Sequence, residues 1–194
     1  MCHKAPSDND SMAPTSHTAR RAPHANLRSR LLRQFSNELR MARTNPLEPV
    51  HATLRLVGTP ALVPAAGVAV ALERKDAALL AMLATAGATP RAALAALLWP
   101  DVDEKGARNN LRQRLFRLNR VSGADVVVGG NVVNLADRVV HDLAALPPRL
   151  AADPHALAGE LLGAFDYGDC AELAAWVNLA REQWRAALRD ALAE

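Results

Sequence analysis

The chain has 194 residues, of which half are hydrophobic and only 4% are aromatic, so its core must consist largely of Ala, Leu and Val. This length fits one ordinary domain with appendages, and a formal net charge of +3 excludes a uniformly polycationic protein. Residues 1–50 hold eight Lys or Arg against four Asp or Glu, whereas residues 139–194 hold four against nine. Such asymmetry is typical of a protein with a nucleic-acid-binding face and a protein-binding part.

The sequence has few of the residues and motifs that form disulfides, metal sites or cofactor sites. The cysteines, Cys2 and Cys170, lie far apart in the chain, which excludes a disulfide framework and predicts reduced thiols. The histidines are isolated and no glycine-rich phosphate loop occurs, so we expect no metal, no cofactor and no enzyme activity. No apolar run approaches the roughly 20 residues of a membrane span, and the N-terminus lacks the apolar segment of a signal peptide. These features predict a cytoplasmic protein.

Residues 1–50 are predicted to form a basic tail. Residues 1–25 are polar and lack the apolar side chains that offset the entropy of ordering, so we expect disorder there. Residues 26–43 differ, because large apolar side chains recur at every fourth position among arginines: Leu27, Leu31, Phe35 and Leu39. This spacing predicts a short basic amphipathic helix. Such a helix could bind DNA phosphates, an anionic membrane surface or a partner protein, or it could belong to an organelle-targeting peptide. The remaining alternative is a marginal helix in a tail that has no binding role.

The next segments predict a small sheet followed by two helices. Residues 51–72 alternate short extended pieces with Pro and Gly, which favours an antiparallel sheet. A helix is expected over residues 74–87, closed by its final glycine. Thr89 as N-cap and Pro90 at the first helical position then predict a second helix that runs to Trp99.

A longer helix is predicted over residues 101–123. Asp101 suits the N-cap position, Glu104 three residues later completes a capping box, and Gly123 suits a left-handed C-terminal position. An apolar stripe recurs at three- and four-residue steps: Ala107, Leu111, Leu115 and Leu118. The helix holds six cations and, after Glu104, no anion.

The polar face of this helix has the residue types that bind DNA. Arg, Asn and Gln form bidentate hydrogen bonds with guanine and adenine edges, and an apolar ring contacts a thymine methyl. Base recognition is therefore assigned to Asn109, Arg112, Gln113 and Arg120, with Phe116 for a thymine methyl. Phosphate contacts are assigned to flanking cations and to the start of the second helix: Arg91, Arg108, Arg114 and Arg117. The alternative is a solvated charged face, although such faces usually mix charge signs.

Residues 124–136 predict a β-hairpin, because two Val-rich stretches flank Gly129-Gly130-Asn131. A sheet, three helices and a hairpin follow one another in the order of a winged helix-turn-helix, in which the third helix enters the major groove and the hairpin is the wing. We therefore predict an α+β winged-helix DNA-binding domain over residues 51–146 and a short helical extension over residues 147–194.

Five segments resemble one group of regulators: LRLVGTPALV (54–63), LERKDAALLAML (72–83), LAALLWPD (94–101), ARNNLRQRLFRLNR (107–120) and VVHDLAAL (139–146). They are similar to the OmpR-type winged-helix domain of bacterial transcriptional activators of the Streptomyces antibiotic regulatory protein type. The resemblance implies tandem binding to direct repeats in promoters and recruitment of RNA polymerase. It also implies that polymerase faces the loop between the second and third helices: Trp99, Pro100, Asp101 and Asp103.

The C-terminal segment LLGAFDYGDCAELAAWVNLAREQWRAAL (161–188) resembles the start of the helical-repeat activation domain of the same group. Here it covers about one helical pair, whereas a repeat array needs about three units to bury its faces. The apolar stripe of the last helix therefore packs either on the winged helix or on another copy of the chain, through Trp176, Trp184 and Leu188. A second departure is the wing tip, which holds no Lys or Arg. Asn131 and the nearby Arg138 are the candidates for minor-groove contact.

Together these patterns predict a sequence-specific transcriptional regulator, an activator by resemblance, that binds double-stranded DNA and RNA polymerase. No membrane or small-molecule partner is expected. The alternative is a winged-helix interaction module whose basic face docks an acidic protein, and the salt dependence of duplex binding distinguishes the two.

Overall fold

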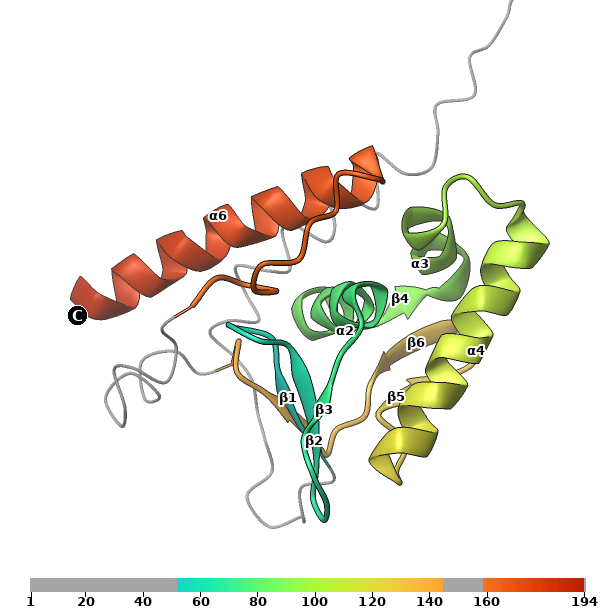
Figure 1. Ribbon diagram of the computed structural model, residues 1–194, viewed down its shortest axis with the longest axis horizontal. Coiled ribbons are helices and arrows are strands. Elements are labelled where there is room, and N and C mark those ends of the chain that lie inside the picture. Colours follow the sequence, from blue (N-terminus) through green and yellow to red (C-terminus); the bar gives the residue numbers. More distant parts are fainter. Residues whose placement is uncertain (1–51, 145–158, 194) are drawn as a thin grey trace, which may run out of the picture.

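The computed structural model describes residues 52–144 and 159–193. Four helices and two sheets lie within these ranges, so the protein is α+β, as predicted. The predicted tail with its helix at residues 26–43, and the predicted boundary between residues 146 and 147, lie outside the described residues. Figure 1 shows α2 (Arg74–Ala86) at the centre, with the first sheet on one side and α4 on another.

The first sheet has the strand order β3-β2-β1-β7. β1 (Ala52–Arg55) pairs antiparallel with β2 (Ala61–Pro64), and β2 pairs antiparallel with β3 (Val70–Ala71), as the sequence predicted. The sequence did not predict β7 (Val139–His141), which joins β1 in parallel. The first sheet is therefore mixed and is closed by residues that follow the hairpin.

Asp142 holds the end of β7 against the chain that leaves β1. Its carboxylate accepts hydrogen bonds from the amides of Leu56, at 2.8 Å, and Val57, at 2.9 Å. Its own amide donates to the carbonyl of Leu54 at 3.2 Å. Because a buried carboxylate is tolerated only when its oxygens are hydrogen-bonded, these contacts explain why an acidic residue lies in the core.

α2 is buried on every side from its first turn onward, so it forms the centre of the core rather than a surface helix. Its predicted glycine end is confirmed, because Gly87 has φ +63 and donates its N–H to the carbonyl of Leu83. α3 (Arg91–Leu98) and α4 (Glu104–Ser122) follow and pack against each other. All three predicted helices are therefore present.

The start of α3 differs from the prediction. Thr89 and Pro90 form the short strand β4 (Thr89–Pro90), which pairs with β6 (Val132–Leu135), and the helix begins at Arg91 with Pro90 as its N-cap. The Thr89 hydroxyl donates to the carbonyl of Gly87 instead of capping α3. The local capping signal was overridden because the hairpin, remote in sequence, pairs with these two residues.

β5 (Val127–Gly129) and β6 form the predicted hairpin around Gly130 and Asn131. Gly129 has φ +111, and a Cβ there would lie 2.2 Å from the carbonyl oxygen of Val132, so glycine is required. The hairpin and β4 form the second sheet, with the order β4-β6-β5. Figure 1 shows this sheet between α2 and α4.

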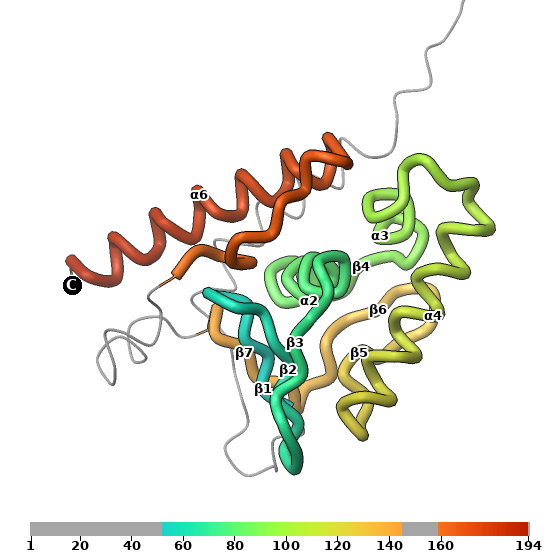
Figure 2. The backbone as a smooth tube through the Cα atoms, in the orientation of Figure 1, coloured from blue at the N-terminus to red at the C-terminus, as the bar shows by residue number. Residues whose placement is uncertain are grey.

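The C-terminal segment packs on the same core as the rest of the described chain. Leu161 forms a β-bridge with Val57, and the amide of Leu162 donates to the carbonyl of Leu56 at 2.7 Å. α6 (Ala171–Ala193) then passes beside α3, as Figure 2 shows. A single hydrophobic cluster joins side chains from both described ranges.

Candidate nucleic-acid interface

α4 separates a buried apolar face from an exposed polar face, as its sequence predicted. The apolar stripe is buried: Ala107, Leu111, Leu115 and Leu118. The side chains assigned to base recognition are all exposed: Asn109, Arg112, Gln113, Phe116 and Arg120. Their spacing of three and four residues places them on one side of the helix. Gly123 ends α4 in the predicted left-handed conformation, with φ +68.

The beginning of α4 does not match the prediction. The helix starts at Glu104 with Asp103 as its N-cap, and the side chain of Asp103 makes no capping hydrogen bond. Asp101 lies inside a turn in which the amide of Val102 donates to the carbonyl of Trp99 at 3.3 Å. The predicted capping box is therefore wrong, because this turn delays the helix by two residues.

Two of the exposed polar side chains are already joined. Nη2 of Arg112 donates to Oδ1 of Asn109 at 3.0 Å, which orients a guanidinium beside a carboxamide. Within the described ranges, no ion pair engages Arg112 or Arg120. Phe116 lies on the same side with 68% of its surface exposed. This face therefore presents donors, an acceptor and an apolar ring to a partner.

Arg114 and Arg117, which were assigned to phosphates, turn toward the start of α2. Oδ2 of Asp76 lies 3.2 Å from Nη1 of Arg114 and 3.1 Å from Nη2 of Arg117. Nη1 of Arg117 also lies 3.0 Å from Oε1 of Glu73, and Arg114 pairs with Oε2 of the same carboxylate. Two cations of α4 therefore face two carboxylates, and we name these four residues the α2–α4 ionic cluster.

The two carboxylates of the α2–α4 ionic cluster have different environments. Asp76 is 3% exposed, and burial raises its pKa above the ordinary value, while Arg114 and Arg117 oppose this shift. The hydrogen bond from Arg114 lowers the pKa of Glu73, whose side chain is 56% exposed. Asp76 therefore acts as a buried anchor for α4, whereas Glu73 lies at the solvent edge. The available sequence signal was the acidic residue that directly precedes the apolar run of α2.

Arg108, another predicted phosphate contact, pairs with Glu104 one turn earlier on α4. Both side chains are more than half exposed, and exposed pairs of this kind contribute little stability. Arg108 can therefore separate from Glu104 at little cost in free energy. Arg114 differs, because only 24% of its side chain is exposed.

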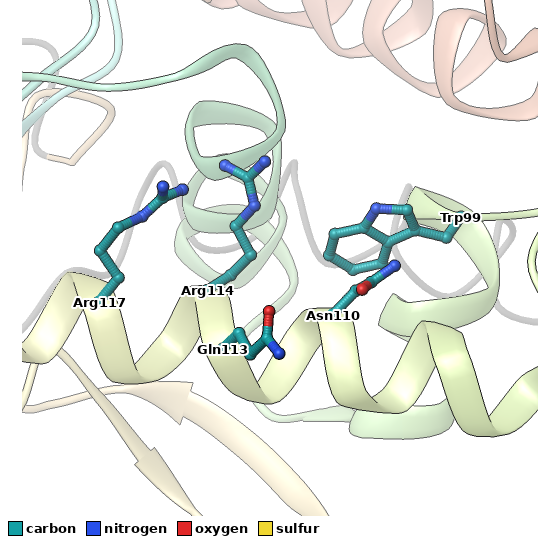
Figure 3. Close-up of a pocket in the computed structure, with 5 residues that line it drawn as sticks. All are labelled: Trp99, Asn110, Gln113, Arg114 and Arg117. Carbon is teal, nitrogen blue, oxygen red and sulfur yellow. The ribbon is translucent and has the colours of Figure 1, made fainter.

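A pocket of about 460 Å³ opens beside α4 and is lined by Trp99, Asn110, Gln113, Arg114 and Arg117. Figure 3 shows the two arginines rising from α4 on the same side, with Trp99 and Asn110 at the other end. Its walls offer carboxamide and guanidinium groups beside an indole. Because Gln113 also belongs to the exposed face, the pocket adjoins that face.

The hairpin turn is held against the start of α3 by Arg91. The amide of Arg91 donates to the carbonyl of Asn131 at 2.9 Å, and its Nη2 donates to the carbonyl of Gly129 at 3.3 Å. The turn itself holds no Lys or Arg, but Arg91 places a cation beside it. Asn131 is exposed, and Arg138 is half-buried just before β7.

Asn119 joins the hairpin to the last turns of α4. Its Oδ1 accepts hydrogen bonds from the amides of Val126, at 3.0 Å, and Val127, at 3.3 Å. Its Nδ2 donates to Oδ1 of Asp125 at 3.0 Å. The helix and the hairpin are therefore placed relative to each other by a residue that the helical periodicity did not single out.

The residues of the loop that was assigned to polymerase differ in their exposure to solvent. Trp99 is 9% exposed, and Nζ of Lys75 lies 5.2 Å from the centroid of its ring. Pro100, Asp101 and Asp103 are exposed. The loop therefore offers an acidic surface to a partner, while the indole contributes to the core.

The two indoles assigned to a partner interface pack within the chain. Trp176 is 2% exposed and Trp184 is 1% exposed, and Leu188 is half-buried. Of the two alternatives for this stripe, packing in cis is the one observed for these tryptophans. Leu192, with 63% exposure, is the apolar side chain that extends beyond this contact.

The acidic turn before α6 is fixed to the first turn of α2. Arg74 forms an ion pair with Asp169 and donates to the carbonyl of Asp166 at 2.7 Å. The hydroxyl of Tyr167 donates to the carbonyl of Arg74 at 2.9 Å, and burial raises the pKa of this phenol. These acidic residues therefore have structural partners that explain their position.

Within residues 52–144 and 159–193, no group of three or more His, Cys, Asp or Glu side chains lies close enough to hold a metal ion. No helix in these ranges is long and apolar enough to cross a membrane. Comparisons with protein-family models, curated proteins and solved structures found no match. Function must therefore be argued from the chemistry of this surface.

Proposed function

We propose that the chain is a sequence-specific regulator of transcription that binds double-stranded DNA by placing α4 in the major groove. The observation that carries this proposal is the exposed face of α4, where Asn109, Arg112, Gln113 and Arg120 share one side. These are the side chains that recognise adenine and guanine edges in the major groove. The opposite face is buried against the core, so these side chains lie on the side of α4 that faces solvent.

The elements around α4 support a winged helix-turn-helix. α3 and α4 pack against each other as consecutive helices, and the β5–β6 hairpin follows directly. In such domains the hairpin is the wing and the helix before the recognition helix crosses the backbone. Arg91 fits this arrangement, because it joins the start of α3 to the hairpin turn and places its charge there.

The resemblance to bacterial activators of the Streptomyces antibiotic regulatory protein type extends this proposal. It implies tandem binding to direct repeats, contact with RNA polymerase, and a bacterial cytoplasmic protein with neither a cofactor nor enzyme activity. The exposed acidic loop around Asp101 and Asp103 is the surface for polymerase in this proposal. The C-terminal segment then acts as a support for α2 and α3, against which it packs.

A second candidate is a protein-interaction module, and one observation favours it. Phe116 and Val121 are exposed on α4 with 68% and 43% of their surfaces accessible, and apolar side chains are common at protein interfaces. In this alternative the cations of α4 bind an acidic partner. The two candidates differ in their response to duplex DNA.

The test is selection of bound duplexes from a randomised pool, followed by affinity measurements at several salt concentrations. DNA recognition through α4 predicts enrichment of a short motif and a log–log salt slope that steepens by about 0.9 for each phosphate contact. An enriched motif repeated in the same orientation supports tandem binding. Failure to retain any duplex at low salt would refute DNA binding and leave the interaction module.

A further inference from the structure

The α2–α4 ionic cluster bears on how the proposed DNA surface distinguishes sequences. Arg117 lies four residues after Gln113 and three before Arg120, so it borders the exposed face of α4. Its side chain is 47% exposed, and its guanidinium contacts Glu73 and Asp76 at 3.0 Å and 3.1 Å. A cation at the edge of the face is thus held by carboxylates from another helix.

We infer that Glu73 is a specificity-determining residue that holds Arg117 away from DNA phosphates and so limits sequence-independent affinity. This inference rests on the proposed DNA-binding function. Phosphate contacts by Arg and Lys supply essentially all of the affinity of a regulator for random DNA. An arginine paired with a carboxylate adds little to that affinity, and the carboxylate itself repels a phosphate.

The two carboxylates of the α2–α4 ionic cluster have different roles. Asp76 is buried and contacts both arginines, so it positions α4 against α2. Glu73 is 56% exposed and makes no capping hydrogen bond at the start of α2, although it occupies the N-cap position. Substitution of Glu73 therefore removes a charge beside Arg114 and Arg117 and leaves the contacts of both arginines with Asp76 in place.

Solvent space beside the arginines supports the same conclusion. The pocket of about 460 Å³ reaches both Arg114 and Arg117 from the side of Gln113. Figure 3 shows Arg117, Arg114 and Gln113 following one another along α4. Without the charge of Glu73, Nη2 of Arg117 keeps its contact with Asp76, while Nη1 loses its carboxylate partner and becomes available to a phosphate that borders the major groove.

The experiment compares Glu73→Gln with Glu160→Gln in the full chain. Each variant removes one negative charge, and Glu160 pairs with Arg185 in the C-terminal segment. Figure 1 places that segment on the other side of α2 from α4. Affinity for a random duplex and for the selected duplex is measured from low to high salt, and thermal unfolding confirms that both variants are folded.

Glu73→Gln is expected to steepen the salt slope on random duplex by about 0.9, which corresponds to a gain of about eightfold at 0.1 M relative to 1 M salt. The ratio of selected to random affinity should fall, while Glu160→Gln matches the unmodified chain. Equal behaviour of the two variants would overturn the inference. If the unmodified chain binds no duplex, the proposed function fails instead, so the two failures are distinguishable.

Discussion

Arg112 offers the sharpest single test of base recognition, because no ion pair within the described residues competes for its guanidinium. Nη2 is oriented by Oδ1 of Asn109 at 3.0 Å, and the remaining N–H groups are available for a guanine edge. A bidentate contact of this kind contributes about 1–3 kcal/mol to discrimination between bases. Arg112→Ala should therefore weaken binding to the selected duplex by about 5- to about 140-fold.

Two companion variants separate base recognition from charge. Arg112→Lys keeps the positive charge but lacks the planar fork, so affinity for random duplex should persist while preference for the selected sequence falls. Arg189→Ala removes an exposed arginine from α6 and should leave both affinities near those of the unmodified chain. Because these positions are exposed, stability should change by no more than about 0.5 kcal/mol in each variant.

The assay is competitive fluorescence anisotropy with the selected duplex and a scrambled duplex of equal length. An equal loss on both duplexes for Arg112→Ala would place this residue on a phosphate rather than a base. Unchanged affinity and unchanged preference would refute the placement of α4 in the groove.

Three further predictions concern the C-terminal segment and are measured by unfolding. Trp184→Ala should cost about 3–5 kcal/mol, because the indole is almost fully buried in the shared core; a cost under ~1 kcal/mol would contradict that packing. Gly163→Ala should also destabilise, because φ is +55 and a Cβ would lie 2.2 Å from the carbonyl oxygen of Gly58, whereas Gly130→Ala, with open space around it, is the control. Burial raises the pKa of Tyr167, so the unfolded phenol ionises first and stability should fall as pH rises above about 10, a loss that Tyr167→Phe should abolish.

Local signals predicted the elements whose structure depends on nearby residues. The four-residue spacing of Leu111 and Leu115 predicted the buried side of α4, and Gly129 with Gly130 predicted the hairpin, because both patterns depend on residues close together in the sequence. The parallel pairing of β7 with β1 was not predictable in this way. It joins residues more than eighty positions apart, and Val139–His141 is too short to show a periodicity.

The same limit applies to the candidate interface. The exposed face of α4 followed from helical geometry, so the five residues assigned to bases were all found exposed on it. The ion pairs of Arg114 and Arg117 with Glu73 and Asp76 could not be predicted, because the partners belong to another helix that only the tertiary fold brings near. Their assignment to phosphates was therefore based on charge alone.

The most direct test of the central claim is NMR titration of the chain with the selected duplex. The side-chain amide signals of Asn109 and Gln113 report the exposed face of α4, and that of Asn178, exposed on α6, is the internal reference. DNA binding through α4 predicts that the first two signals shift strongly while the signal of Asn178 stays in place. Shifts confined to α6, with Asn109 and Gln113 unchanged at saturation, would contradict it.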